Sequence, residues 1–123
     1  MKILVIDDDE QMRTLIRQVV EWGGDEVVEA ADGRAGMEQQ RLHHADLVIT
    51  DLIMPEQEGL ETITFLQKEF PDTKIIAISG GGRIGPEAYL PAAKELGADR
   101  VFTKPFDVKE LSNAIRELLT NGE

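Results

Sequence analysis

Short runs of consecutive apolar residues alternate along the chain with longer segments in which apolar residues recur every three or four positions. The short runs are rich in Ile and Val, which is typical of strands that are buried on both faces of a sheet. The longer segments have the spacing of amphipathic helices. Strands are therefore expected at residues 3–6, 26–30, 46–50, 74–79 and 100–103.

Helices are expected between these strands and after the last one. The first helix follows an N-cap at Asp8 or Asp9. The fourth helix has two possible starts: near Leu90, with Pro91 in its first turn, or near Pro86, with a bend at Pro91. The expected ranges are 10–22, 34–43, about 59–69, within 86–96, and a segment capped by Asp107 that runs to about 120.

A strand followed by a helix, repeated five times, is typical of an α/β domain with a parallel sheet. Right-handed crossover connections place helices on both faces of such a sheet. We therefore expect a flavodoxin-like (βα)5 doubly wound fold with strand order 2-1-3-4-5, in one domain that spans residues 1–123. In that order, the switch point at which ligands bind lies between strands 1 and 3.

The composition narrows the classes of partner. The chain of 123 residues has a formal net charge of −11, which disfavours binding to nucleic acid or to an anionic membrane surface. It has no cysteine, so disulfides and thiolate metal sites are excluded. The N-terminal apolar run is too short for a signal peptide and no stretch has the length of a membrane span, so a cytoplasmic location is expected.

Polar side chains stand at the carboxyl ends of four expected strands. Each alone has an ordinary explanation, such as a helix cap, a turn or a solvated side chain. The carboxyl ends of parallel strands share one edge of a sheet, so together these residues predict a ligand site. They are Asp7 and Asp8 after the first strand, Asp51 after the third, Ser79 at the end of the fourth, and Lys104 after the fifth.

Carboxylates gathered at one edge repel one another. Two like charges 5 Å apart cost about 3 kcal/mol at an effective dielectric constant of about 20. Either one carboxyl group has a raised pKa, or the group binds a divalent cation. Oxygen ligands without His or Cys favour Mg²⁺ or Mn²⁺, and Mg²⁺ commonly shares a phosphate oxygen. A carboxylate beside such an ion and a lysine is a candidate nucleophile toward a phosphoryl group.

Four motifs contain these residues: VIDDDE at 5–10, ITDLIMPEQEG at 49–59, AISGGG at 77–82 and GADRVFTKPF at 97–106. Together they resemble the CheY-like receiver domains of response regulators, and the resemblance covers essentially the whole chain. It implies a phosphorelay signalling switch of a two-component system. Because the chain stops at Glu123 without an output domain, we expect either a stand-alone receiver or the receiver of a longer protein.

The resemblance also implies a Mg²⁺ site. The paired acids Asp7 and Asp8 correspond to the family's metal ligands, and Asp51 corresponds to the phosphoacceptor, which is also a ligand. The residue two positions after Asp51 is Ile53, and the resemblance implies that its backbone carbonyl contacts the metal. Mg²⁺ is the expected cofactor.

By the same resemblance, Ser79 and Lys104 contact the phosphoryl group on Asp51. The implied donor is a phosphohistidine on a sensor histidine kinase or a histidine phosphotransfer protein, and the implied output is changed binding to a downstream protein. No nucleic-acid or membrane partner is expected for this domain. The protein is expected not to be an ordinary enzyme but a phosphoacceptor that assists its own phosphorylation and dephosphorylation.

The sequence departs from the family pattern in two places: the segment after Ser79 is longer and richer in glycine than usual, and a position near Lys104 lacks an aromatic residue. An aromatic residue often stands three positions before the lysine, where this chain has Val101. The nearby aromatic is Phe102, which strand alternation places on the opposite face of the sheet. The bond between Lys104 and Pro105 is often cis in the family.

Two other functions fit parts of the pattern. A small aspartyl phosphatase of the haloacid-dehalogenase type would use Asp7 as nucleophile and Asp9 as acid/base, but Gln11 stands where such motifs prefer Thr or Val. A protein-interaction module that works without phosphorylation is the second alternative. The glycine-rich segment at 80–85 lacks the Lys-Ser/Thr ending of a P-loop, which disfavours a nucleotide site.

Overall fold

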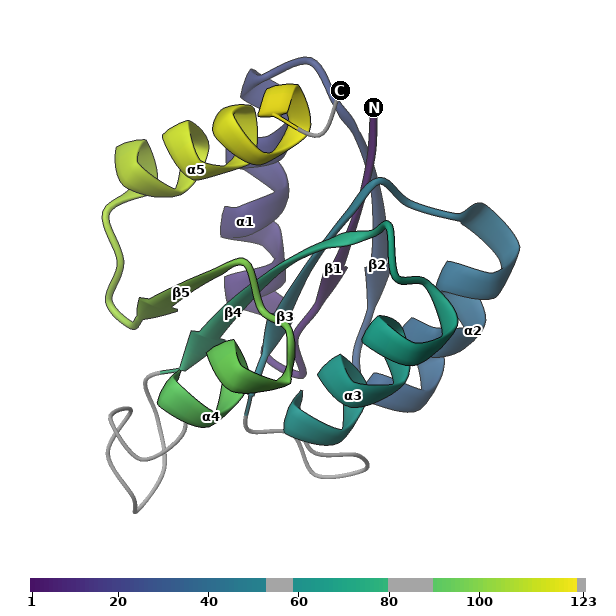
Figure 1. Ribbon diagram of the computed structural model, residues 1–123. Coiled ribbons are helices and arrows are strands. Elements are labelled where there is room, and N and C mark those ends of the chain that lie inside the picture. The colour runs from purple at the N-terminus through teal and green to yellow at the C-terminus, as the bar shows by residue number, and fades with distance from the viewer. Residues whose placement is uncertain (53–58, 80–89, 122–123) are drawn as a thin grey trace.

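The computed structural model describes residues 1–52, 59–79 and 90–121. Within these residues the chain forms a five-stranded parallel sheet with the strand order β2-β1-β3-β4-β5 (Figure 1). The predicted α/β fold and strand order are therefore confirmed. The strands are β1 (Lys2–Ile6), β2 (Glu26–Ala30), β3 (Leu47–Asp51), β4 (Lys74–Ser79) and β5 (Arg100–Thr103).

Helices cover both faces of the sheet (Figure 1). Helices α1 and α5 pack on one face, and α2, α3 and α4 pack on the other. Alternate strand residues enter the two cores, so that Ile3 and Val5 lie among residues of α1 and α5, whereas Leu4 and Ile6 lie on the opposite face. The described helices are α1 (Glu10–Trp22), α2 (Gly33–His43), α3 (Gly59–Glu69), α4 (Leu90–Leu96) and α5 (Val108–Asn121).

The central strands are buried on both faces, as their apolar runs predicted. All five residues of β3 are buried, and in β1 and β4 only the first residue is partly exposed. Burial of each large aliphatic side chain contributes about 1.5–3 kcal/mol, so this central layer anchors the fold. No helix in the part of the chain that the structure describes is long and apolar enough to cross a membrane.

Local signals explain where the helices begin. The carboxylates of Asp9 and Asp107 each accept hydrogen bonds from two backbone amides in the first turn of α1 and α5, respectively, which confirms both predicted N-caps. The described part of α4 begins at Leu90, with Pro91 as its second residue. The two predicted starts of this helix are not distinguished, because residues 80–89 lie outside the described residues, as does the whole glycine-rich segment.

At the amino ends of the strands, an ion pair joins the sheet to the last helix. Asp25 lies just before β2 and is 8% exposed. Its carboxylate pairs with the guanidinium of Arg116 in α5, and its Oδ1 lies 3.6 Å from the amino group of Met1. This buried acid is therefore matched by positive charge.

Candidate functional site

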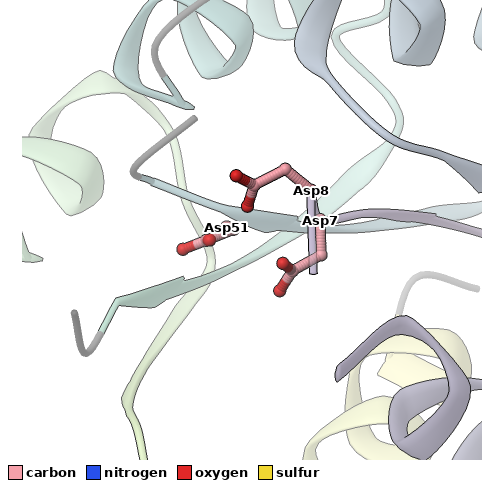
Figure 2. A group of neighbouring side chains, drawn as sticks. All are labelled: Asp7, Asp8 and Asp51. Atoms are coloured by element: carbon pink, nitrogen blue, oxygen red, sulfur yellow. The ribbon is translucent and has the colours of Figure 1, made fainter. Parts of the chain in front are cut away.

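Three aspartates converge at the carboxyl edge of the sheet (Figure 2). Asp7 and Asp8 follow β1, and Asp51 is the last residue of β3. These two strands are neighbours in the sheet, with Ile6 beside Thr50, so the acids that end them lie together. Carboxylate oxygens from the three aspartates all lie within 4.8 Å of one another. A donor set made only of carboxylate oxygens fits Mg²⁺.

One ammonium group faces these carboxylates. Lys104 Nζ lies 3.1 Å from Asp7 Oδ2 and 3.4 Å from Asp51 Oδ2. Burial acts to lower the pKa of Lys104, but the negative charges of Asp51 and Asp7 outweigh it and raise the pKa above its ordinary value. The amine is therefore charged at neutral pH. With all three acids ionised, three negative charges and one positive charge leave these four side chains with a formal charge of −2.

Asp7 is the most deeply buried of the three acids, with 1% exposure. This burial raises the pKa of Asp7, and the raise persists although the Asp9 amide donates to Asp7 Oδ1 at 2.9 Å and Lys104 lies close by. Asp8, in contrast, is exposed. Keeping Asp7 ionised in this position costs free energy that a bound cation would offset.

Ser79 ends β4 at the same edge. Its register partner in β5 is Thr103, and the residue before it, Ile78, pairs with Asp51. Ser79 is fully buried, and its Oγ has no hydrogen-bond partner among the residues that the structure describes. Buried polar groups are nearly always satisfied, so a hydroxyl in this position is suited to a ligand.

Helix α3 begins directly against the end of β3, and a glycine makes this approach possible. The amide of Gly59 donates to the carbonyl of Leu52 at 3.0 Å. A Cβ at position 59 would lie 2.3 Å from Leu52 Cα and 2.4 Å from the carbonyl oxygen of Asp51. Glycine therefore fits here without displacing the backbone that carries Asp51.

The structure places five of the six predicted site residues at one edge of the sheet, namely Asp7, Asp8, Asp51, Ser79 and Lys104. The sixth, Ile53, lies outside the described residues, so its contact with a metal stays a prediction. The peptide bond between Lys104 and Pro105 is cis.

Asp9 does not join the cluster of carboxylates. Its Oδ1 accepts from the backbone amides of Gln11 at 2.9 Å and Met12 at 3.4 Å, as an N-cap of α1. The alternative of an aspartyl phosphatase needs Asp9 as its acid/base. In the structure Asp9 instead caps helix α1, which does not support the phosphatase alternative.

The sequence did not predict a role for Arg13. Its Nη1 donates to the backbone carbonyl of Asp7 at 2.7 Å, and its Nε donates to Glu29 at 3.3 Å. The only signal in the sequence was a basic residue near the start of α1, a helix with two acidic and two basic residues. That signal does not separate a solvated arginine from one that reaches the strand end.

Val101, which stands where the family often has an aromatic residue, and its neighbour Phe102 lie on opposite faces of the sheet, as strand alternation predicted. Phe102 is buried in the core between the sheet and helices α1 and α5. Val101 packs against the core on the other face.

A family model described as "Response regulator receiver domain" matches residues 3–116. The chain belongs to this family. Receiver domains are parts of two-component response regulators; they are phosphoacceptor switches and commonly not classical enzymes. The acidic cluster of this receiver domain lies at the carboxyl edge where the fold places ligand sites.

The similar proteins differ in length. Chemotaxis protein CheY of Halobacterium salinarum is 32% identical over 119 residues, which is 97% of each chain. The probable transcriptional regulator ycf27 of Cyanophora paradoxa is 38% identical over 122 residues, which is 99% of this chain and 49% of that protein. A crystal structure of a receiver domain protein from Clostridium thermocellum has a TM-score of 0.89 at 30% identity, covering 98% of this chain and 94% of that one. The chain thus spans nearly all of some relatives and about half of others.

Proposed function

We propose that residues 1–123 form a receiver domain that acts as a phosphorelay switch and accepts a phosphoryl group on Asp51. The observation that carries this proposal is the charge at one edge of the sheet, where three carboxylates face one ammonium group. Two surplus negative charges suit a divalent cation and the phosphoryl group that it neutralises. A cluster with only a structural role would be expected to balance its buried charges.

Asp7, Asp8 and Asp51 would hold Mg²⁺ through carboxylate oxygens, and the backbone carbonyl of Ile53 would be a further ligand. When bound, the ion would neutralise negative charge on the phosphoryl oxygens during transfer. Asp8 is exposed, whereas Asp7 and Asp51 are buried, so the cluster meets solvent on the side of Asp8. The phosphoryl donor would enter from that side.

In the transfer step, a carboxylate oxygen of Asp51 attacks the phosphorus of a phosphohistidine. The new O–P bond makes an acyl phosphate, while the N–P bond breaks and its electron pair stays on the imidazole, which takes up a proton. Lys104 Nζ, 3.4 Å from Asp51 Oδ2, is placed to pair with one phosphoryl oxygen. The Ser79 hydroxyl is suited to donate a hydrogen bond to another phosphoryl oxygen. The same two residues would assist hydrolysis, with water as the attacking group.

Two classes of partner follow from this chemistry. The donor would be a sensor histidine kinase or a histidine phosphotransfer protein, and the output would be altered binding of a downstream protein. The phosphoryl group carries a charge of about −1.5 to −2, which would draw Lys104 toward it. Next to Lys104, a surface pocket of about 510 Å³ lies beside β5 and the start of α5 and includes Pro105 and Phe106. A coupling free energy of about 1–3 kcal/mol between the phosphoryl site at Asp51 and this pocket is enough for a switch.

The test is incubation with Mg²⁺ and acetyl phosphate as a small phosphodonor, followed by the mass of the intact protein. We expect the wild type to gain one phosphoryl group and Asp51→Asn to gain none. Asp25→Asn is the matched control, because it makes the same chemical change at the opposite edge, and we expect it to be labelled like the wild type.

Equal labelling of Asp51→Asn would contradict the proposal. No label on the folded wild type would favour an interaction module that works without phosphorylation. Turnover of unrelated phosphate esters would favour a phosphatase.

A further inference from the structure

Arg13 connects helix α1 to the turn that carries the first two aspartates. Its side chain is 17% exposed, although it is a long cation on the helix surface. Nη1 donates to the backbone carbonyl of Asp7 at 2.7 Å, and Nε donates to Oε1 of Glu29 at 3.3 Å. Near the cluster its hydrogen bond is therefore made to the backbone and not to a carboxylate.

The position of the Asp7 carbonyl affects the directions of the Asp7 and Asp8 carboxylates. This carbonyl belongs to the peptide bond between Asp7 and Asp8, and this bond is planar. Holding its oxygen restrains the peptide plane, which contains the Cα atoms of both residues. Other contacts fix neighbouring points of the turn: the amide of Asp7 donates to the carbonyl of Ala30 at 3.1 Å, and the amide of Asp9 donates to Asp7 Oδ1 at 2.9 Å.

Glu29, on strand β2, orients the guanidinium of Arg13. Its Oε1 accepts from Arg13, and its Oε2 accepts from Arg17 Nη1 at 2.7 Å. Arg17 is 49% exposed and also pairs with Glu21 on the same helix. The two arginines lie one helical turn apart and share one carboxylate, but of the two only Arg13 is bonded to the acid-bearing turn.

We infer that Arg13 is a positioning residue that sets the directions of the Asp7 and Asp8 carboxylates and thereby the affinity of the cluster for Mg²⁺. The inference rests on the proposed function for the identity of the metal. A guanidinium near a cation site repels the ion, so an arginine that acted through its charge alone would weaken Mg²⁺ binding. An arginine that positions the metal ligands strengthens Mg²⁺ binding. Removal of the side chain therefore changes the affinity in opposite directions in the two cases.

The test measures the affinity for Mg²⁺ alone, by following the backbone amide signals of Asp8 and Asp51 in NMR titrations. We expect Arg13→Met to bind Mg²⁺ about tenfold more weakly than the wild type, which is the usual size for loss of a group that orients a metal ligand. Arg13→Lys retains the charge, but one ammonium group does not reproduce the planar pair of contacts, so it is also expected to bind more weakly. Arg17→Met is the matched control and is expected to stay within about twofold of the wild type.

Amide hydrogen exchange in the Mg²⁺-free protein gives a second readout. The Asp9 amide is expected to exchange faster in both Arg13 variants and at the wild-type rate in Arg17→Met, because the turn that it closes has lost its anchor. The amide of Val48 in the buried strand β3 serves as the reference for global stability. Thermal unfolding establishes that each variant is folded before either measurement.

Equal or tighter Mg²⁺ binding by Arg13→Met, with an unchanged Asp9 amide, would overturn the positioning role. Failure of Asp51 to accept a phosphoryl group, with the effects of Arg13 on Mg²⁺ intact, would overturn the proposed function and leave this inference standing. No Mg²⁺ binding by the wild type would overturn both this inference and the metal site.

Discussion

Two buried aspartates lie at opposite edges of the same sheet, and their surroundings differ in charge. Asp25, at the amino edge, faces the guanidinium of Arg116 and the amino group of Met1. Asp7, at the carboxyl edge, belongs to a cluster of three carboxylates that faces one ammonium group. The first acid is balanced by its neighbours, whereas the second stands in a site with two surplus negative charges.

This difference separates a structural charge from a functional one. A buried acid with a cationic partner is tolerated because the pair compensates much of the desolvation penalty. A buried acid with like charges around it destabilises the fold, and such arrangements are concentrated at ligand sites. The raised pKa of Asp7, caused first by its burial, is the signature of that cost. The comparison predicts that changes at the two edges shift stability in opposite directions.

The largest expected effect on stability is at the amino edge. Arg116→Met leaves Asp25 buried without its guanidinium partner and is expected to lower the free energy of unfolding by about 2 kcal/mol. This loss is smaller than for a fully buried pair, because the Arg116 side chain is 43% exposed. Urea denaturation monitored by circular dichroism measures this change in the free energy of unfolding.

Arg100→Met is the control for this prediction. It removes the partner of Glu117, also on α5, but both of these side chains are largely solvated. A change of at most about 1 kcal/mol is expected, because the substitution removes a surface ion pair and the contact of the Arg100 guanidinium with the Phe102 ring, 5.7 Å from its centroid. Equal effects of the two substitutions would show that the Asp25 pair is no more than a surface contact.

A smaller effect of opposite sign is expected at the carboxyl edge. Asp7→Asn removes a desolvated negative charge from the cluster and is expected to raise the free energy of unfolding of the Mg²⁺-free protein by about 1 kcal/mol. Asp25→Asn, the same chemical change at the other edge, is expected to lower it. Loss of stability in both variants would contradict the comparison.

The pH dependence of the Asp7→Asn effect gives a further check. The pKa of Asp7 is raised in the folded state, so the unfolded chain loses this proton first as the pH rises. The ionisation of Asp7 therefore begins to destabilise the wild type near the ordinary value of 3.8, and the penalty levels off above the folded-state pKa. The stability difference between Asp7→Asn and the wild type should grow with pH over that interval. A difference that shrinks with rising pH would show that Asp7 is stabilised as a carboxylate.

Most of the fold could be predicted from the sequence because its signals are local. The helical spacing of α1 ends at two glycines, and the apolar run of β4 ends at a serine, so both ranges were predicted as the structure has them. Strand β3 was predicted one residue early. Its last residue, Asp51, was placed directly after the strand, but its backbone continues the ladder and pairs with Ile78.

The cluster of acids could be predicted because parallel strands end at a common edge, whatever lies between them in the chain. The side-chain contacts made by Arg116 and Arg13 could not be predicted. Arg116 and Asp25 are 91 positions apart, and their pairing depends on how far a side chain of α5 reaches past the sheet. The hydrogen bond from Arg13 to the Asp7 carbonyl depends equally on a side-chain rotamer, which the spacing of residues does not encode.

The most direct test of the central claim is the free energy of unfolding of the wild type as a function of Mg²⁺ concentration, at constant ionic strength adjusted with NaCl. A divalent cation that completes the acid cluster should stabilise the protein by about 1.4 kcal/mol at ten times its dissociation constant. Asp7→Asn should lose most of this stabilisation, while Arg100→Met should keep it. No more stabilisation from Mg²⁺ than from NaCl of equal ionic strength would contradict the claim that these carboxylates form a metal site.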